Sequence, residues 1–271
     1  MPDALTIMLQ AVSIAGIVCY AIAAIQLWNG LRSTSPTSGL APTSAFLAAL
    51  LHGAGIVYIA LNFGGLSTSF FDALSIAAFI IVLAAFTSLR QQSYSPLLLP
   101  VFVIALLSLV LNLAFATHTP LVADSLGMLF HIVSSIIAYV LLSLATLHAL
   151  LLMLLERELR HPHGSAWLGR LPPLLSLESM LFRLIALGWL ALTVAIGSGI
   201  IFIEDIFAQH LSHKTAFSII SWLMFSILLA GRQLFGWRSG TAIRWTFGAF
   251  LALILAYFGS KFVLEVILNR S

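Results

Sequence analysis

Apolar runs of about 20 residues recur along the chain, and they constrain its fold more than any other feature. A helix needs roughly 20 mostly apolar residues to cross the hydrocarbon core of a bilayer. Backbone groups in lipid must find hydrogen bonds within their own segment, so helix is the expected conformation. The sequence therefore predicts an all-α integral membrane protein, a bundle of about eight transmembrane helices. The predicted spans are Leu5–Trp28, Ala41–Asn62, Ser69–Leu89, Pro96–Thr117, Leu126–Leu155, Leu181–Ile203, Thr215–Gly231 and Ala242–Leu264.

Composition also excludes a water-soluble globule. Of the 271 residues, 61% are hydrophobic and 8% are charged, whereas soluble domains carry about 25% charged residues. The mean hydropathy is +1.10 and the sequence pI is about 9.4. In a membrane protein, Lys and Arg report orientation and contact lipid head groups. We therefore expect the lipid bilayer as a partner and no nucleic-acid function.

The single cysteine, Cys19, lies inside the first apolar run. It excludes a disulfide framework, a C-x-x-C redox pair and a C-x-x-C-H site for covalent haem attachment. The first run lacks a basic leader and is too long for a signal-peptide core, so we expect it to be a retained span. We expect one polytopic domain over residues 1–271, with four spans in 1–125 and the rest in 126–264.

The basic residues predict an orientation, because Lys and Arg in short loops stay on the cytoplasmic side. With the N-terminus outside, nine of the twelve fall on the inner side: Arg32, Arg90, Arg157, Arg160, Arg170, Arg183, Arg232, Arg238 and Arg244. The outer side then keeps Lys214, Lys261 and Arg270. This asymmetry predicts that the N-terminus and the C-terminus are both extracytoplasmic.

The fifth predicted span carries two histidines, His131 and His148. At about 1.5 Å per residue they lie roughly 25 Å apart along a helix, so they cannot bind one ligand together. Helical spacing places His131 on one face with Ser134, Ser135 and Tyr139, a polar stripe expected to face the bundle. We expect His148 at the membrane interface without a chemical role.

Two further histidine positions are candidates for binding. His52 lies mid-span beside Gly53 and Gly55, small residues that permit close approach of a helix or a flat cofactor. His210 and His213 are three residues apart in the sixth loop, after Glu204 and Asp205, but no third ligand with zinc spacing follows. The alternative for the membrane histidines is a side chain that only hydrogen-bonds a neighbouring helix, and the alternative for the loop is a solvated connector.

Three segments of the second half of the chain are similar to one family of membrane proteins. They are HIVSSIIAYVLLSLATLHALLLMLLERELR, LPPLLSLESMLFRLIALGWLALTVAIGSGI and HKTAFSIISWLMFSILLAGRQLFGWRSGTAIRWTFGAFLALILAYFGSKFV. They resemble the cytochrome c assembly membrane-protein family of the CcsA and CcmC type, and most closely its small eight-span YpjD-like and HemX-like branch. The resemblance covers about residues 126–264. It rests on His131 with Ser135 and Tyr139, on LPPL…ES…F and on GW…G…A…AYFG.

The resemblance implies haem handling at the extracytoplasmic face. His131 occupies the place of the family's first outer histidine, which makes it the expected axial ligand of a non-covalent haem b iron. His52 and His213 are the candidate second ligands. Tyr139 is a candidate orienting group, and Ser135 is a further candidate cofactor-binding residue of the same site.

The chain departs from the family pattern at two places. Full assembly proteins of the family carry a tryptophan-rich outer loop, but no Trp occurs here between Trp189 and Trp222. A second outer histidine, expected near the C-terminus, is replaced by the stretch Val266 to Asn269. These departures argue against haem transfer to apocytochrome and leave haem binding or an accessory role open.

We therefore expect a non-enzymatic protein of the bacterial inner membrane that binds or handles b-type haem in support of cytochrome c maturation. Its expected partners are haem and other cytochrome maturation proteins. One alternative is a HemX-like regulatory or scaffold protein that acts through its arginine-rich cytoplasmic loops. Another is a small-solute transporter, for which paired interrupted helices in the two halves are the usual sign, and the sequence lacks that sign.

The predicted orientation can be tested with reporter fusions. A reporter fused at Gly164 should score as cytoplasmic, and one fused at Gln209 should score as extracytoplasmic, because nine of the twelve basic residues fall on the side of Gly164 and three on the side of Gln209. Phosphatase and fluorescent-protein activity of the two fusions would measure this. The reverse pattern would contradict the orientation and the outer location of His131.

Overall fold

A computed structural model describes residues 4–32, 40–62, 65–67, 69–86, 97–116, 125–159, 173–202 and 209–259. These residues form eight α-helices and a terminal π-helix, which confirms the all-α prediction. The helices are α1 (Ala4–Arg32), α2 (Leu40–Asn62), α3 (Phe70–Phe86), α4 (Leu98–Phe115), α5 (Leu126–Leu159), α6 (Leu174–Phe202), α7 (Gln209–Phe235) and α8 (Ser239–Ile254), and the π-helix η4 is Leu255–Gly259.

Seven of the described helices are long and apolar enough to cross a membrane. The remaining one, α3, is apolar throughout but has 17 residues, slightly short for a full span. Large apolar side chains are widely exposed on the helices, with Leu61 79% exposed and Ile201 72% exposed. Such surfaces suit lipid as the surrounding solvent. The expected multi-pass membrane protein is thereby confirmed.

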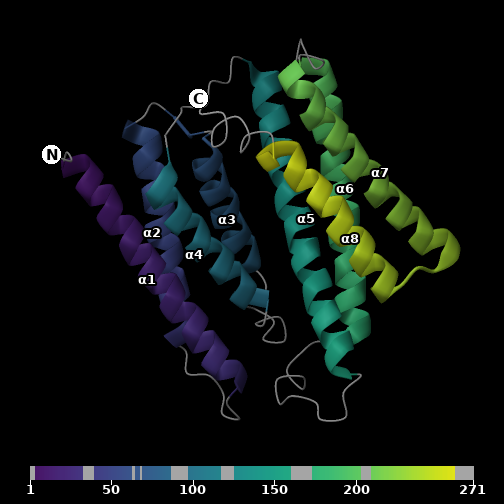
Figure 1. The fold of residues 1–271 in the computed structure, drawn as a ribbon, viewed down its shortest axis with the longest axis horizontal. Helices are drawn as coiled ribbons and strands as arrows, with labels where there is room; N and C mark the ends of the chain where they lie inside the picture. Colours follow the sequence, from purple (N-terminus) through teal and green to yellow (C-terminus); the bar gives the residue numbers. More distant parts are fainter. Residues whose placement is uncertain are drawn as a thin grey trace. The chain divides into compact units, whose positions relative to one another are not determined.

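The helices form two compact units (Figure 1). The first contains α1 to α4, and the second contains α5 to α8 with η4. In the first unit, α1 packs against α2 and α4, and α3 packs against α4 and α2. In the second unit, α5 packs most extensively against α6, α7 pairs with α6 and α8, and α8 also contacts α5.

Two helices begin earlier than the hydropathy pattern predicted. The sixth span was expected to start at Leu181, but α6 starts at Leu174. The seventh was expected to start at Thr215, but α7 starts at Gln209. In both cases polar residues that we assigned to loops are helical, because helix satisfies the backbone hydrogen bonds whatever the side chains are. The sixth loop, which we placed at Glu204–Lys214, is therefore helical from Gln209 onward, and its earlier residues lie outside the described part.

Small residues let α5 and α6 approach closely. A Cβ atom added at Gly188 of α6 would lie 2.6 Å from Leu142 Cδ2 and 2.7 Å from its Cγ. Leu142 on α5 is completely buried, so it has little room to move. Nearer the other end of the pair, a Cβ at Gly127 would lie 2.4 Å from the Phe202 ring. In both places a glycine makes room for a side chain of the facing helix, and small residues of this kind are common where helices pack in membranes.

A reciprocal pair of tryptophans joins α6 to α7. The indole Nε1 of Trp189 donates to Ser226 Oγ at 2.7 Å, and the indole Nε1 of Trp222 donates to Thr193 Oγ1 at 2.8 Å. Each hydroxyl in turn donates to a carbonyl of its own helix, that of Trp189 or of Trp222. The two rings stack with centroids 5.9 Å apart. Every polar atom of the pair is thus satisfied without water, as a lipid environment requires.

The close approach at Gly188 predicts a stability effect. Gly188→Ala should destabilise the protein by about 1–3 kcal/mol, the usual cost of overpacking a core, because the new methyl group meets the buried Leu142. Thermal unfolding in detergent would measure this. Gly197→Ala on the same helix is the matched control, since a Cβ there meets no heavy atom within 4 Å. Equal melting temperatures for the two variants would contradict the packing argument.

Candidate functional site

His131 lies in the second turn of α5 and contacts the far end of α6. Its Nδ1 is 2.8 Å from the carbonyl oxygen of Ala195 and 3.3 Å from Ser198 Oγ. A carbonyl oxygen only accepts hydrogen bonds, so Nδ1 carries the proton in the neutral ring. The other nitrogen, Nε2, then holds a lone pair, and within the described residues no hydrogen bond occupies it. The ring is therefore oriented by α6 while its ligating atom is left available.

The surroundings of His131 belong to one end of the second unit. α5 begins there and α6 ends there, since His131 meets Ala195 near the last turns of α6. α7 begins a few residues after α6 ends, so its first turns lie at the same end, as Figure 1 also shows. By the predicted orientation this end faces the extracytoplasmic side.

The polar stripe around His131 divides between two neighbours. Ser134 is buried, and its hydroxyl donates to the His131 carbonyl at 3.0 Å. Tyr139 donates its hydroxyl to the carbonyl of Leu253 on α8 and packs edge-on against Tyr257 and Phe258 of η4. Tyr139 thus bonds to α8, whereas His131 bonds to α6. Its expected role as an orienting group for the haem site stays a prediction.

Ser135 and His213 complete the predicted set in this unit. Ser135 is partly exposed on α5, next to Ser134 in the chain. His213 and His210 lie in the first turns of α7 rather than in a loop, and their side chains lie outside what the structure describes. Glu204 and Asp205 also fall outside the described residues. Among the residues that are described, no group of three or more His, Cys, Asp or Glu side chains could hold a metal ion.

His52 lies in the first unit, and both of its ring nitrogens are engaged. Nδ1 is 3.3 Å from the hydroxyl of Tyr20, and Nε2 is 2.9 Å from Ser75 Oγ. The side chain is 2% exposed, and the Phe79 ring lies 5.2 Å from it. A Cβ at the neighbouring Gly53 would lie 2.8 Å from Phe79, so the close approach expected at this glycine is made by a side chain of α3. Ligation of haem iron by His52 would require the ring to release one of its hydrogen bonds.

His148 is packed inside the second unit, where its side chain is 3% exposed. Its expected place at the membrane interface stays a prediction. Its Nδ1 donates to the carbonyl of Leu144 on its own helix at 2.8 Å. α5 has 34 residues and continues to Leu159, about 51 Å at 1.5 Å per residue. The helix therefore carries His148 within its packed length and not at its end.

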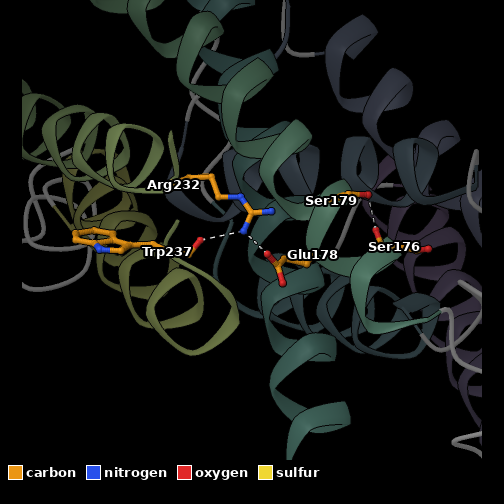
Figure 2. Close-up of polar contacts among 5 residues, drawn as sticks. All are labelled: Ser176, Glu178, Ser179, Arg232 and Trp237. Atoms are coloured by element: carbon orange, nitrogen blue, oxygen red, sulfur yellow. Dashed lines mark hydrogen bonds and ion pairs between the residues drawn. The ribbon is translucent and has the colours of Figure 1, made fainter. Parts of the chain in front are cut away.

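Sequence reasoning missed a partly buried ion pair in the second unit (Figure 2). Arg232 of α7 pairs with the carboxylate of Glu178 of α6 and donates to the carbonyl of Trp237 at 3.1 Å. Its guanidinium carbon also lies 4.6 Å from the centre of the Phe182 ring. Glu178 and Phe182 belong to the LPPL…ES…F motif, and Trp237 belongs to a Gly-Trp pair. A single charged residue inside a mainly apolar run was the signal that could have revealed this pair.

The ion pair gives those motif residues a structural role. Glu178 is 2% exposed, so its carboxylate depends on Arg232 for compensation. Gly231 makes room for the turn, since a Cβ there would lie 2.4 Å from the Trp237 ring. Gly236 has φ of +63°, a left-handed conformation that favours glycine at the bend between α7 and α8. Arg232 therefore joins α6, α7 and the bend before α8.

The apolar helices and the histidine at one end of the second unit define a multi-pass membrane protein with a candidate metal-ligand site. The chain belongs to the cytochrome c assembly protein family, which matches residues 40–268. Our sequence analysis limited the resemblance to about 126–264, and the match corrects this, since it extends back through α2, α3 and α4.

Two relatives are similar over most of their length. Inner membrane protein YpjD of Escherichia coli (strain K12) is 30% identical over 194 residues, which cover 69% of this chain and 72% of that protein. An uncharacterized 28.8 kDa protein in the nifR3-like 5'region of Azospirillum brasilense is 31% identical over 212 residues, covering 76% and 77%. The name of the first relative agrees with the expected inner-membrane location. No solved structure matches the chain.

The ion pair predicts an asymmetry between its two partners, because Glu178 is buried and Arg232 is partly exposed. Arg232→Met should destabilise the protein by about 3 kcal/mol, because it leaves the buried carboxylate of Glu178 uncompensated. We take the lower end of the usual range because 34% of the Arg232 side chain is exposed to solvent. Glu178→Gln should cost less, because the remaining guanidinium can reach water. Melting temperatures in detergent would compare them, and a larger loss for Glu178→Gln would contradict the argument.

Proposed function

We propose that this protein binds b-type haem non-covalently near the extracytoplasmic face of the inner membrane, with His131 as an axial ligand, in support of cytochrome c maturation. It acts as a binding protein and not as an enzyme. The observation that carries the proposal is the Nδ1 contact of His131 with the Ala195 carbonyl at 2.8 Å. Metal-ligating histidines usually donate their second ring N–H to a carbonyl or carboxylate, which fixes the tautomer and the ring orientation.

The donor chemistry at His131 fits haem iron. A neutral imidazole with a free Nε2 lone pair is a common axial ligand, and the bond to the other nitrogen raises its basicity. When bound, haem would supply redox chemistry and an iron centre whose potential depends on its axial ligands. The chain's own contribution is to bind the iron through His131, hold the ring through Ala195 and Ser198, and surround it with apolar helices.

Membership of the cytochrome c assembly family supports the same proposal, because His131 lies within the residues that match a family of assembly proteins. His213 remains the candidate second ligand in this unit, since it lies in the first turns of α7, at the end where α5 begins. His52 is the less favoured candidate because both of its nitrogens are already hydrogen-bonded. Haem transfer to an apocytochrome is not part of the proposal.

The proposal predicts a spectral change when His131 is replaced. The detergent-purified protein should show a Soret band, as isolated or after haem is added. His131→Ala should lower haem occupancy or convert a six-coordinate spectrum into a five-coordinate one, because the iron loses an axial nitrogen. Absorption spectra and haem titration of the folded variant would measure this.

His148→Ala is the matched control, since it removes a second α5 histidine whose Nδ1 is also bonded to a backbone carbonyl. It should leave the haem spectrum unchanged once size-exclusion chromatography confirms that the variant is folded. An unchanged spectrum and affinity in His131→Ala would contradict the ligand assignment. A wild-type protein that binds no haem but co-purifies with a maturation protein would instead favour the regulatory or scaffold role.

A further inference from the structure

The end of α8 changes from α-helix to π-helix at Leu255. The π turn η4 begins in the packed part of the second unit, since Leu253 is 1% exposed and Ala256 is 3% exposed. Such turns occur mostly as single widened turns of α-helices, frequently at functional sites. A widened turn takes one helical carbonyl away from its usual N–H partner, and a buried carbonyl has no water to bond. The turn therefore needs a hydrogen-bond donor from outside α8.

Tyr139 of α5 supplies that donor. Its hydroxyl donates to the carbonyl of Leu253, which lies just before the turn. The same hydroxyl oxygen accepts the backbone N–H of Tyr257. Residues 253 and 257 are four apart, so in an α-helix this carbonyl and this N–H would bond to each other. The Tyr139 hydroxyl thus stands between the two groups of one missing helical hydrogen bond.

Aromatic contacts hold the Tyr139 ring in this position. It packs edge-on against Tyr257 and Phe258, with ring centres 6.2 and 6.3 Å away. Those two rings pack edge-on against each other at 5.1 Å. The side chain therefore meets η4 with its ring against the aromatic side chains and its hydroxyl between the backbone groups. Insertion of a side chain is one of the few causes that interrupt the i→i−4 hydrogen bonds of a helix.

η4 approaches the end of the second unit that carries His131. α7 begins at that end, and α8 returns toward it from the bend at Gly236 (Figure 1). His131 lies eight residues before Tyr139 on α5, about 12 Å along the helix axis. The hydroxyl of Tyr139 has given its one proton to α8, so it has none to donate to a haem group.

We propose that Tyr139 is a positioning residue of the second unit, whose inserted hydroxyl holds the end of α8 in the π conformation. Without the hydroxyl, the Leu253 carbonyl and the Tyr257 N–H bond to each other and the turn closes to an α-helix. Closing the turn rotates the residues after it by about 100°, the angle of one helical residue. The influence of Tyr139 on bound haem, which rests on the proposed function, passes through α8 and not through contact.

Tyr139→Phe tests the proposal, because it keeps the ring and removes the hydroxyl. The chain has five tyrosines, so NMR of ¹⁵N-tyrosine-labelled protein in detergent micelles gives few amide signals, and Tyr257→Phe identifies the one of interest. The Tyr257 amide signal should move in Tyr139→Phe, because its acceptor changes from a hydroxyl to the Leu253 carbonyl. It should also stay protected from hydrogen exchange. An unmoved signal, or one that loses its protection, would contradict the proposal.

A spin label reports the rotation of the turn. Attached through Phe258→Cys in a Cys19→Ala background, the label should change its accessibility to oxygen dissolved in the lipid when Tyr139→Phe is added. A label at Leu251, which precedes the turn and is 58% exposed, should report no change. Equal accessibility at position 258 with and without the Tyr139 hydroxyl would overturn the proposal.

Thr146→Val is the matched control. It removes another hydroxyl of α5, one that donates to the Leu142 carbonyl of the same helix, so the Tyr257 amide should stay as in wild type. A shift equal to that of Tyr139→Phe would overturn the proposal. If Tyr139→Phe fails to fold, the wild type still decides. Its Tyr139 hydroxyl proton should exchange slowly and show a nuclear Overhauser effect to the Tyr257 amide proton, and absence of both would contradict the insertion.

Haem spectra separate a positioning role from a place in the haem site. With haem added, Tyr139→Phe should keep the coordination state of the wild type, whereas His131→Ala changes it. A changed coordination state in Tyr139→Phe with an unmoved Tyr257 amide would place Tyr139 in the haem site and overturn the proposal. If the wild type binds no haem, the NMR and spin-label results still decide, so failure of haem binding and failure of this proposal can be told apart.

Discussion

A polar side chain that a helix carries into the hydrocarbon core finds no water there, so its partner must come from its own helix or from a neighbouring one. This constraint explains the most specific contacts of the molecule. The indoles of Trp189 and Trp222 bond to hydroxyls on the opposite helix, and Tyr139 bonds to a backbone carbonyl of α8. Among the described residues, Thr246 Oγ1 is the buried side-chain atom that lacks a hydrogen-bond partner. Polar residues here therefore define which helices are neighbours, while the apolar residues fill the remaining space.

Hydropathy and helical periodicity predicted the helices well but not their partners. Spacing placed His131 and Tyr139 on one face of α5, and both do turn toward other helices. The first bonds to α6 and the second to α8, however, because α5 is long enough to meet different neighbours at different heights. Periodicity describes the direction of a side chain around one helix. It carries no information on which helix lies opposite. The hydrogen bond from His131 to the Ala195 carbonyl therefore could not be predicted from the sequence.

The early start of α6 has a related cause. Ser176, Glu178 and Ser179 lowered the hydropathy of this stretch, so a loop was predicted up to Leu181. In the structure Ser179 bonds to the carbonyl of Ser176, and Glu178 is neutralised by Arg232, which is 54 positions away in the chain. A hydropathy scale counts the full free-energy cost of moving each polar group out of water, as if the group had no partner. Pairing removes much of that cost, and the pair is visible only once α6 and α7 lie together (Figure 2).

The family match begins at residue 40, so it includes His52 and Ser75 but not Tyr20. One partner of the His52 ring thus lies inside the family region and the other before it. Within that region two histidines of similar sequence context have different environments. His52 has hydrogen bonds at both ring nitrogens, which fix the ring between α1 and α3. His131 has one nitrogen fixed by a carbonyl, which suits a metal ligand. His131 was predicted as a haem ligand from the family resemblance, and His52 as a candidate second ligand from its place mid-span beside small residues. The distinction arises from the neighbouring helices, since only they decide whether a ring nitrogen keeps a lone pair for iron.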